Sequence, residues 1–134
     1  MKRWQKVLIA IVFVVILVFV GIYLYLSNSL DQLVTMGVED IDISTLKDGT
    51  YIGEYSVVPV SATVEVKILN GEINDIIILD HGNGQGRPAE VIIDSVIDEQ
   101  SLKVDTISGA TYSSRVIIKA IEEALKQAKL NGGI

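Results

Sequence analysis

The sequence predicts an α+β fold: an antiparallel sheet with two amphipathic helices packed on it, preceded by one N-terminal transmembrane helix. Three observations predict this fold class. An uncharged apolar run lies near the start of the chain, apolar and polar residues then alternate with a period of two, and two later segments place apolar residues at helical spacing. Strands followed by helices within one short domain are typical of the α+β class.

Residues 7–26 are the predicted transmembrane anchor. They carry no charge, and only Gly21 lies outside the apolar set. At ~1.5 Å per residue this run reaches ~30 Å, about the thickness of one hydrocarbon core. A cleaved signal peptide has a shorter apolar region, of about 7–15 residues, and a small-residue cleavage site. Residues 27–30 match such a site poorly, so the sequence favours a retained anchor over a cleaved peptide or a buried soluble helix.

Charge divides the chain at the same point. Residues 1–6 contain Lys2, Arg3 and Lys6, so the positive-inside rule predicts a cytoplasmic N-terminus, a single pass through the cell membrane and an extracytoplasmic domain. Residues 27–134 carry 8 basic and 17 acidic side chains, a formal charge of −9. This acidity argues against a nucleic-acid partner, which needs clustered Lys and Arg. The absence of cysteine excludes disulfides, thiolate metal sites and thiol catalysis.

The rest of the chain divides into three parts. A juxtamembrane tether or short helix is expected over residues 27–47, the folded domain over 48–130, and a tail over 131–134. Within the domain, runs rich in β-branched residues predict three strands, over residues 51–58, 63–69 and 72–79.

The second and third predicted strands form a hairpin. Asn70-Gly71 separates them, and this pair readily takes the positive φ values of a type I′ turn. Alternate residues of the first arm are expected on opposite faces of the sheet. The buried set is Val64, Val66 and Ile68, and the solvent-facing set is Thr63, Glu65 and Lys67.

Two amphipathic helices are predicted over residues 88–99 and 112–130. Pro88 suits a first helical turn, because its missing N–H costs nothing there. A loop over 81–86 precedes the first helix, and an extended piece over 103–107 follows it. The apolar stripe expected on the first helix consists of Val91, Ile92, Ile93, Val96 and Ile97. The buried face expected on the second consists of Val116, Ile117, Ala120, Ile121, Ala124, Leu125 and Ala128.

The segment from His81 to Arg87 offers little catalytic chemistry. Its glycines lack the Lys-Ser/Thr of a Walker motif and the spacing of a dinucleotide-binding loop. No nucleophile-elbow pattern supports a Ser-His-Asp site on His81, which is otherwise explained as a polar residue at a strand end. Arg87 could bind an anion through two hydrogen bonds, or be a surface charge. We therefore expect no catalytic residue and no metal site.

Residues 105–114 are the most informative segment. One interpretation is a helix start, in which Gly109 turns the chain and Thr111 or Ser113 caps the helix. The other is an anion site, in which small Gly109 and Ala110 leave the Thr111 hydroxyl accessible and the first N–H groups of the helix point at a phosphate. The helix dipole contributes only about 0.3–1 kcal/mol per charge, so retention of a ligand needs a pocket or a covalent bond.

This segment resembles a motif of the FMN-binding domain family, found in flavin-carrying subunits of the sodium-pumping NADH:quinone reductase and the Rnf complex. The similarity is greatest to the small, single-anchor members. It covers residues 47–129, from Asp-Gly-Thr-Tyr-Ile-Gly at 48–53 to residues 105–114. The family pattern D-x-x-[ST]-G-A-[TS] is matched without departure by Asp105, Ser108, Gly109, Ala110 and Thr111.

The resemblance implies an FMN cofactor joined through a phosphoester to Thr111 by a flavin transferase that uses FAD and magnesium. Contacts to the phosphate or the ring are expected from Ser108, Tyr112, Ser113, Ser114, His81 and Arg87. The implied role is an extracytoplasmic electron carrier serving unidentified redox partners, such as a membrane electron-transfer complex, rather than an independent enzyme. Two alternatives stay open: a module that binds flavin or another phosphate ligand without an ester, and a flavin-independent ectodomain.

Overall fold

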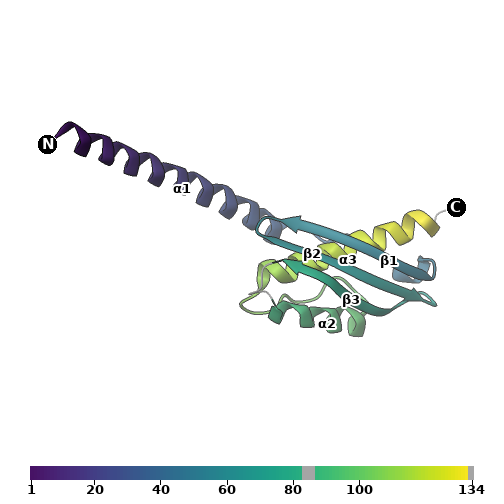
Figure 1. Cartoon of the computed structure of the whole chain (residues 1–134). Coiled ribbons are helices and arrows are strands. Elements are labelled where there is room, and N and C mark those ends of the chain that lie inside the picture. The colour runs from purple at the N-terminus through teal and green to yellow at the C-terminus, as the bar shows by residue number, and fades with distance from the viewer. Residues whose placement is uncertain (83–86, 133–134) are drawn as a thin grey trace.

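The computed structural model describes residues 1–82 and 87–132 and confirms the α+β class (Figure 1). Three antiparallel strands form one sheet in the order β1-β2-β3. The elements are, in chain order, α1 (Arg3–Thr35), the 3₁₀ helix η1 (Ile43–Thr45), β1 (Gly49–Val57), β2 (Val60–Leu69), β3 (Glu72–Gly82), the 3₁₀ helix η2 (Arg87–Val91), α2 (Ile92–Glu99) and α3 (Thr111–Gly132).

Helix α1 is long and apolar enough to cross a membrane. Its most apolar window has a mean hydropathy of 3.3, and none of that window is buried inside the protein, as a core helix would be. The helix continues unbroken beyond the predicted anchor as far as Thr35, so the segment predicted as a tether is part helix and part extended chain. Leu33 is buried in the domain core and attaches the end of α1 to the domain.

The strands lie where the sequence predicts them, but all three are longer. Val57 of β1 pairs with Val60 of β2, so β2 begins three residues before its predicted start and the two strands are paired over nine positions. The predicted type I′ turn is confirmed by positive φ values at Asn70 and Gly71, 54° and 74°. The predicted alternation also holds, because Val64, Val66 and Ile68 are buried while Thr63, Glu65 and Lys67 are not.

The prediction of a loop beginning at His81 is wrong. His81 and Gly82 belong to β3 and pair with Ala62 and Ser61. The physical reason is the early start of β2, which provides ladder partners that local composition does not reveal. The rest of the predicted loop, residues 83–86, lies outside the described residues.

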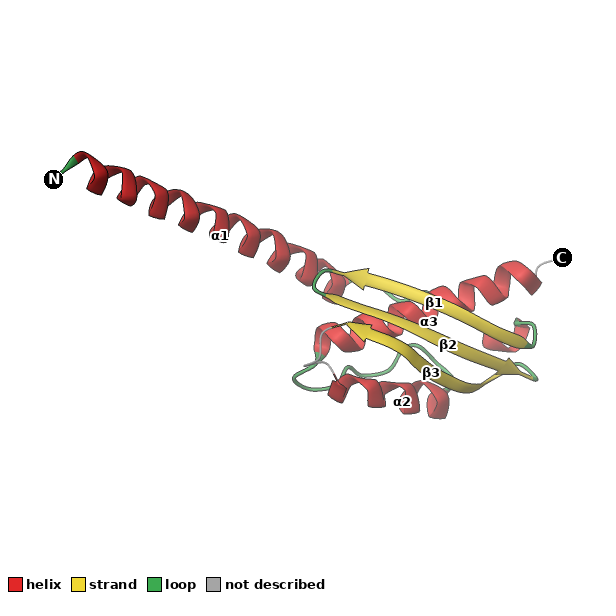
Figure 2. Ribbon diagram, in the orientation of Figure 1, coloured by secondary structure: helices red, strands yellow, loops and turns green. Residues whose placement is uncertain are grey.

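Helix α3 packs directly on the sheet at Gly53. A Cβ atom at this position would collide with the carbonyl oxygen of Ala120 and lie 2.5 Å from the backbone nitrogen of Ala124. Glycine on the strand and alanine on the helix therefore bring the two backbones together. Figure 2 shows α3 lying along one face of the sheet. All seven residues predicted for the buried face of this helix are buried, and they are Val116, Ile117, Ala120, Ile121, Ala124, Leu125 and Ala128.

The helix predicted from Pro88 to Glu99 is wrong in its first turn. That turn is the 3₁₀ helix η2, and α2 starts at Ile92. With about three residues per turn instead of 3.6, the tighter winding changes which side chains face the core. Ala89 is fully buried, and Val91, predicted to be buried, is 55% exposed.

The remaining predictions for this region agree with the structure. Ile92 and Val96 are buried as predicted, and Ile93 and Ile97 are partly buried against the core. No strand is assigned to the described residues 103–107, so the extended piece predicted there stays unpaired chain.

A buried carboxylate holds the segment after α1 against α3. Glu122 is 1% exposed, and its carboxylate accepts hydrogen bonds from Lys119 Nζ at 3.0 Å and from the backbone N–H of Glu39 at 3.3 Å. Lys126 Nζ lies 2.7 Å from the same carboxylate and 3.6 Å from the Glu39 side chain. Burial raises the pKa of Glu122, but the hydrogen bonds from Lys126, Lys119 and Glu39 together leave that pKa below its usual value.

We expect Gly53→Ala to destabilise the domain by about 1–3 kcal/mol, because the added Cβ would push α3 off the sheet. For a domain of this size, each kcal/mol lowers the melting temperature by roughly 4–8 °C. The matched control is Gly37→Ala, which has no atom within 4 Å of its new Cβ. Equal melting temperatures for the two variants, measured by circular dichroism, would contradict the close contact.

We expect Glu122→Gln to weaken the acid dependence of unfolding. Because the folded pKa of Glu122 lies below its usual value of 4.5, its charge stabilises the fold above that pH, and the contribution is lost as pH falls through the folded pKa. Urea midpoints between about pH 5 and pH 3 should fall less steeply in the variant. At neutral pH the variant should be less stable, by up to about 3–5 kcal/mol. The half-exposed neighbour provides a control, since Glu123→Gln should cost at most about 1 kcal/mol.

Candidate functional site

The segment around Thr111 lies at the end of the sheet that α1 joins. Figure 1 shows α3 starting at this end and running toward the opposite one. β3 finishes at the same end, because Gly82 pairs with Ser61 near the β1–β2 turn. His81 and Thr111, which are 30 residues apart in sequence, therefore lie at the same end of the domain.

A tight turn precedes α3. The N–H of Ala110 donates to the carbonyl of Ile107 at 3.0 Å, and Gly109 has a φ of 79°. This left-handed conformation at the third position is the one that favours glycine in a type II turn. A Cβ on Gly109 would meet no atom within 4 Å, so conformation rather than crowding accounts for glycine here.

Ser114 stabilises this turn through two hydrogen bonds of its buried hydroxyl. Its hydroxyl donates to the carbonyl of Ala110 at 2.7 Å and accepts from the N–H of Ile107 at 3.0 Å. The side chain is fully buried. Ser114 thus connects the first turn of α3 to both ends of the preceding turn, and its predicted contact with a phosphate stays a prediction.

Thr111 is the first residue of α3 and is partly exposed. The N–H of Ser114 makes the first helical hydrogen bond, to Ala110, and the N–H groups just before it have no carbonyl one turn back within the helix. The first turn contains no acidic residue to offset the positive end of the helix dipole. The helix start therefore offers a hydroxyl and free N–H donors in a field that favours an anion.

The other predicted contacts differ in exposure. Asp105, Ser108 and Gly109 are exposed, and Tyr112 is 38% exposed. Ser113 is 4% exposed, so its side chain faces the protein interior. Arg87 begins η2, and its side chain lies outside the described part of the structure.

Arg115 is a basic residue that lies outside the sequence motif. It follows Thr111 by four positions, so the two side chains lie on the same side of the helix. Its Nε is buried and has no hydrogen-bond partner among the described residues. The signal available in the sequence was this spacing of four across the start of the predicted helix.

His81 has a partner that the sequence did not indicate. Its Nδ1 lies 3.2 Å from Glu90 Oε1, and its side chain is 4% exposed. An ionised carboxylate only accepts hydrogen bonds, so Nδ1 carries the proton. The opposite ring nitrogen, Nε2, is buried without a partner among the described residues. Buried polar atoms are nearly always bonded, so Nε2 and Arg115 Nε are suited to hold a polar ligand at this end of the domain.

A large hollow of the protein surface lies away from this site. It has a volume of about 550 Å³ and is lined by Asp40, Asp42, Glu72 and Gln100, beside the β2–β3 turn at the opposite end of the sheet. Three carboxylates around this hollow disfavour an anionic ligand. The Thr111 end is therefore the better place for a phosphate-bearing cofactor.

The comparison with protein families decides the cofactor. The model of the FMN-binding domain matches residues 59–126, about half of the chain, including the turn before α3 and Thr111. The chain belongs to the FMN-binding domain family. The resemblance inferred from the sequence motif is therefore confirmed, and so is FMN as the cofactor. Searches of curated proteins and of solved structures found no match.

The match to the FMN-binding domain begins at Pro59, after β1. In the structure, however, β1 pairs with β2 along its whole length and contacts α3 through Gly53. The folded unit therefore extends beyond the matched residues at its N-terminal side.

We expect Ser114→Ala to cost about 1–3 kcal/mol of stability, because it removes two hydrogen bonds and leaves the Ile107 N–H without its partner. The same variant should lower FMN loading, since the turn presenting Thr111 is no longer braced. Ser113→Ala is the control for stability, because it removes a neighbouring buried hydroxyl that makes no such bonds to the turn at residues 107–110. Urea unfolding and flavin absorbance measure the two effects, and equal stability of the two variants would contradict the bracing role.

Proposed function

We propose that this protein is a membrane-anchored, extracytoplasmic flavoprotein that carries electrons through FMN attached to Thr111 by a phosphoester. FMN binding rests on family membership and the anchor on the length and hydropathy of α1. Attachment to Thr111, the extracytoplasmic location and the carrier role are the parts that the proposal adds.

The observation that carries the proposal is the position of Thr111. It is the last residue of the D-x-x-S-G-A-T pattern and the first residue of α3, partly exposed after a turn that glycine shapes. A phosphate esterified to Thr111 Oγ1 would lie against the free N–H groups of the helix start. This arrangement favours Thr111 as the acceptor over the more exposed Ser108 and the buried Ser113.

A covalent bond would retain the cofactor at Thr111, because the field of the helix dipole alone is too weak to do so. The helix dipole contributes about 0.3–1 kcal/mol per charge at an exposed site, far less than is needed to retain a cofactor outside the cell. Arg115, on the same side of the helix as Thr111, would pair with the phosphate. With its proton on Nδ1, His81 would accept a hydrogen bond from a donor group of the ligand at Nε2, while Glu90 keeps the ring oriented.

FMN supplies the one- or two-electron chemistry when bound, and the protein supplies its position and surroundings. The described residues include no cluster of His, Cys, Asp and Glu side chains suited to a metal ion. The proposed partners are a flavin transferase, which makes the ester, and electron donors and acceptors near the membrane.

The orientation follows from charge. Lys2, Arg3 and Lys6 precede the apolar run, and the acidic domain follows it. The positive-inside rule then places the N-terminus in the cytoplasm and the FMN-binding domain on the other side of the membrane.

We expect full-length protein co-expressed with a flavin transferase to keep green flavin fluorescence after denaturing electrophoresis. Thr111→Ala should abolish this fluorescence and the mass increase of the peptide that contains residue 111, because the hydroxyl oxygen is missing. Thr111→Ser should retain both, since it preserves that oxygen. Thr106→Ala, a nearby threonine at a variable position of the pattern, is the matched control.

The outcomes separate the alternatives. Flavin that binds native protein but is released on denaturation indicates a non-covalent FMN module. Covalent flavin in Thr111→Ala would rule out Thr111 as the acceptor.

A further inference from the structure

The turn between β1 and β2 forms an uncharged tip beside the membrane helix. Val58 in this turn is 65% exposed. Residues 55–64 contain no charged side chain, although residues 27–134 contain 8 basic and 17 acidic ones. Val60, Ala62 and Val64 of this stretch are buried in the core, and its exposed residues are Ser56, Val58 and Pro59. In a domain of this acidity, an exposed tip without charge is suited to an environment other than water.

A hollow of about 330 Å³ connects this tip to α1. Tyr25, Ser29 and Met36 line it from the α1 side, and Tyr55 and Val58 line it from the hairpin. None of the described residues that line it is charged. Val58 and Tyr25 therefore border the same hollow.

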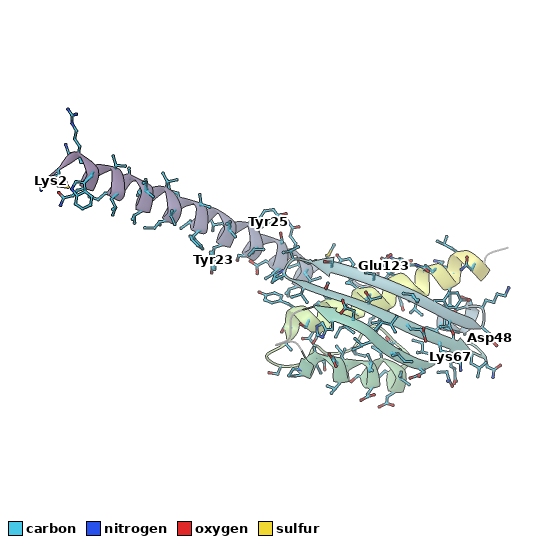
Figure 3. All side chains as sticks on the ribbon, in the orientation of Figure 1. Lys2, Tyr23, Tyr25, Asp48, Lys67 and Glu123 are labelled. Atoms are coloured by element: carbon cyan, nitrogen blue, oxygen red, sulfur yellow. The ribbon has the colours of Figure 1, made fainter. Side chains whose placement is uncertain are left out.

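Tyr25 marks the level of the membrane surface. The apolar run of α1 ends at Leu26, and Tyr25, in its last turn, is 71% exposed. Tyrosine is enriched where a membrane-spanning helix leaves the hydrocarbon core. Figure 3 shows Tyr23 and Tyr25 on the part of α1 that approaches the sheet, and Asp48 and Lys67 at the opposite end of the sheet.

The domain is also held at this position. Leu33 is buried in the core, and the buried Glu122 carboxylate binds the backbone of Glu39 just after α1. The hairpin tip therefore stays close to the point where α1 leaves the apolar layer.

We propose that the β1–β2 turn contacts the bilayer, with Val58 inserted at the boundary between headgroups and acyl chains. The contact rests on the membrane anchor of the proposed function but not on covalent attachment of FMN. It would hold the Thr111 end of the domain against the membrane, so that FMN there faces redox partners in or on the bilayer.

The absence of cysteine makes this contact directly testable. Full-length protein carrying one nitroxide label is reconstituted into phosphatidylcholine vesicles. The labelled positions are Ile16→Cys within the anchor, Val58→Cys at the tip and Leu69→Cys beside the β2–β3 turn. Leu69 is a matched control, because it is an exposed apolar residue at the other end of the sheet. Power saturation compares collisions with oxygen, which concentrates in lipid, to collisions with a water-soluble nickel chelate.

We expect the ratio of oxygen to nickel collisions at position 58 to exceed that at position 69 several-fold and to lie below that at position 16. A label at Ser56, on the same hollow, provides a second reading if Val58→Cys perturbs the turn, and its ratio should also exceed that at 69. Equal ratios at 56, 58 and 69, with position 16 in lipid, would overturn the contact and leave the anchor intact. A water-exposed label at position 16 would instead contradict the anchor, and the contact with it.

Discussion

The close packing of α3 on the sheet at Gly53 is the constraint on which the rest of the structure depends. The backbone of the helix contacts that of the strand there, because neither Gly53 nor the alanines opposite it, Ala120 and Ala124, hold the two apart. This contact sets the distance between α3 and the sheet at β1 and β2. It therefore also positions the helix start, which carries Thr111, relative to β3 and His81.

Polar groups are buried in this domain in two places, with different consequences. Around Glu122, Lys119 and Lys126 satisfy the carboxylate and connect α3 to the segment after α1. Around the start of α3, Ser114 is satisfied, whereas His81 Nε2 and Arg115 Nε have no partner among the described residues. Satisfied groups stabilise the fold, and unsatisfied ones at a sheet end indicate where a ligand completes the structure.

The anchor and the site lie at the same end of the domain. Helix α1 attaches through Leu33, the uncharged β1–β2 turn lies beside it, and α3 begins at this end of the sheet (Figure 1). The charged end of the sheet, with Asp48 and Lys67, lies farthest from α1 (Figure 3). In the proposed carrier, this arrangement would keep the cofactor close to the membrane.

The sequence by itself determined what depends on neighbouring residues: the apolar run of α1, the Asn70-Gly71 turn, the buried face of α3 and the motif ending at Thr111. Each is local, because helix and strand periods and turn preferences act over a few positions. Only the tertiary structure decided the pairing of β1 with β2, the extension of β3 through His81, the contact of His81 with Glu90 and the burial of Glu122. These features depend on contacts between separate elements of the fold. The 3₁₀ turn that exposes Val91 was also decided by the tertiary structure, because packing there overrides local preference. The motif thus indicated a candidate cofactor segment, and the fold determined which buried groups lie at the same end of the sheet.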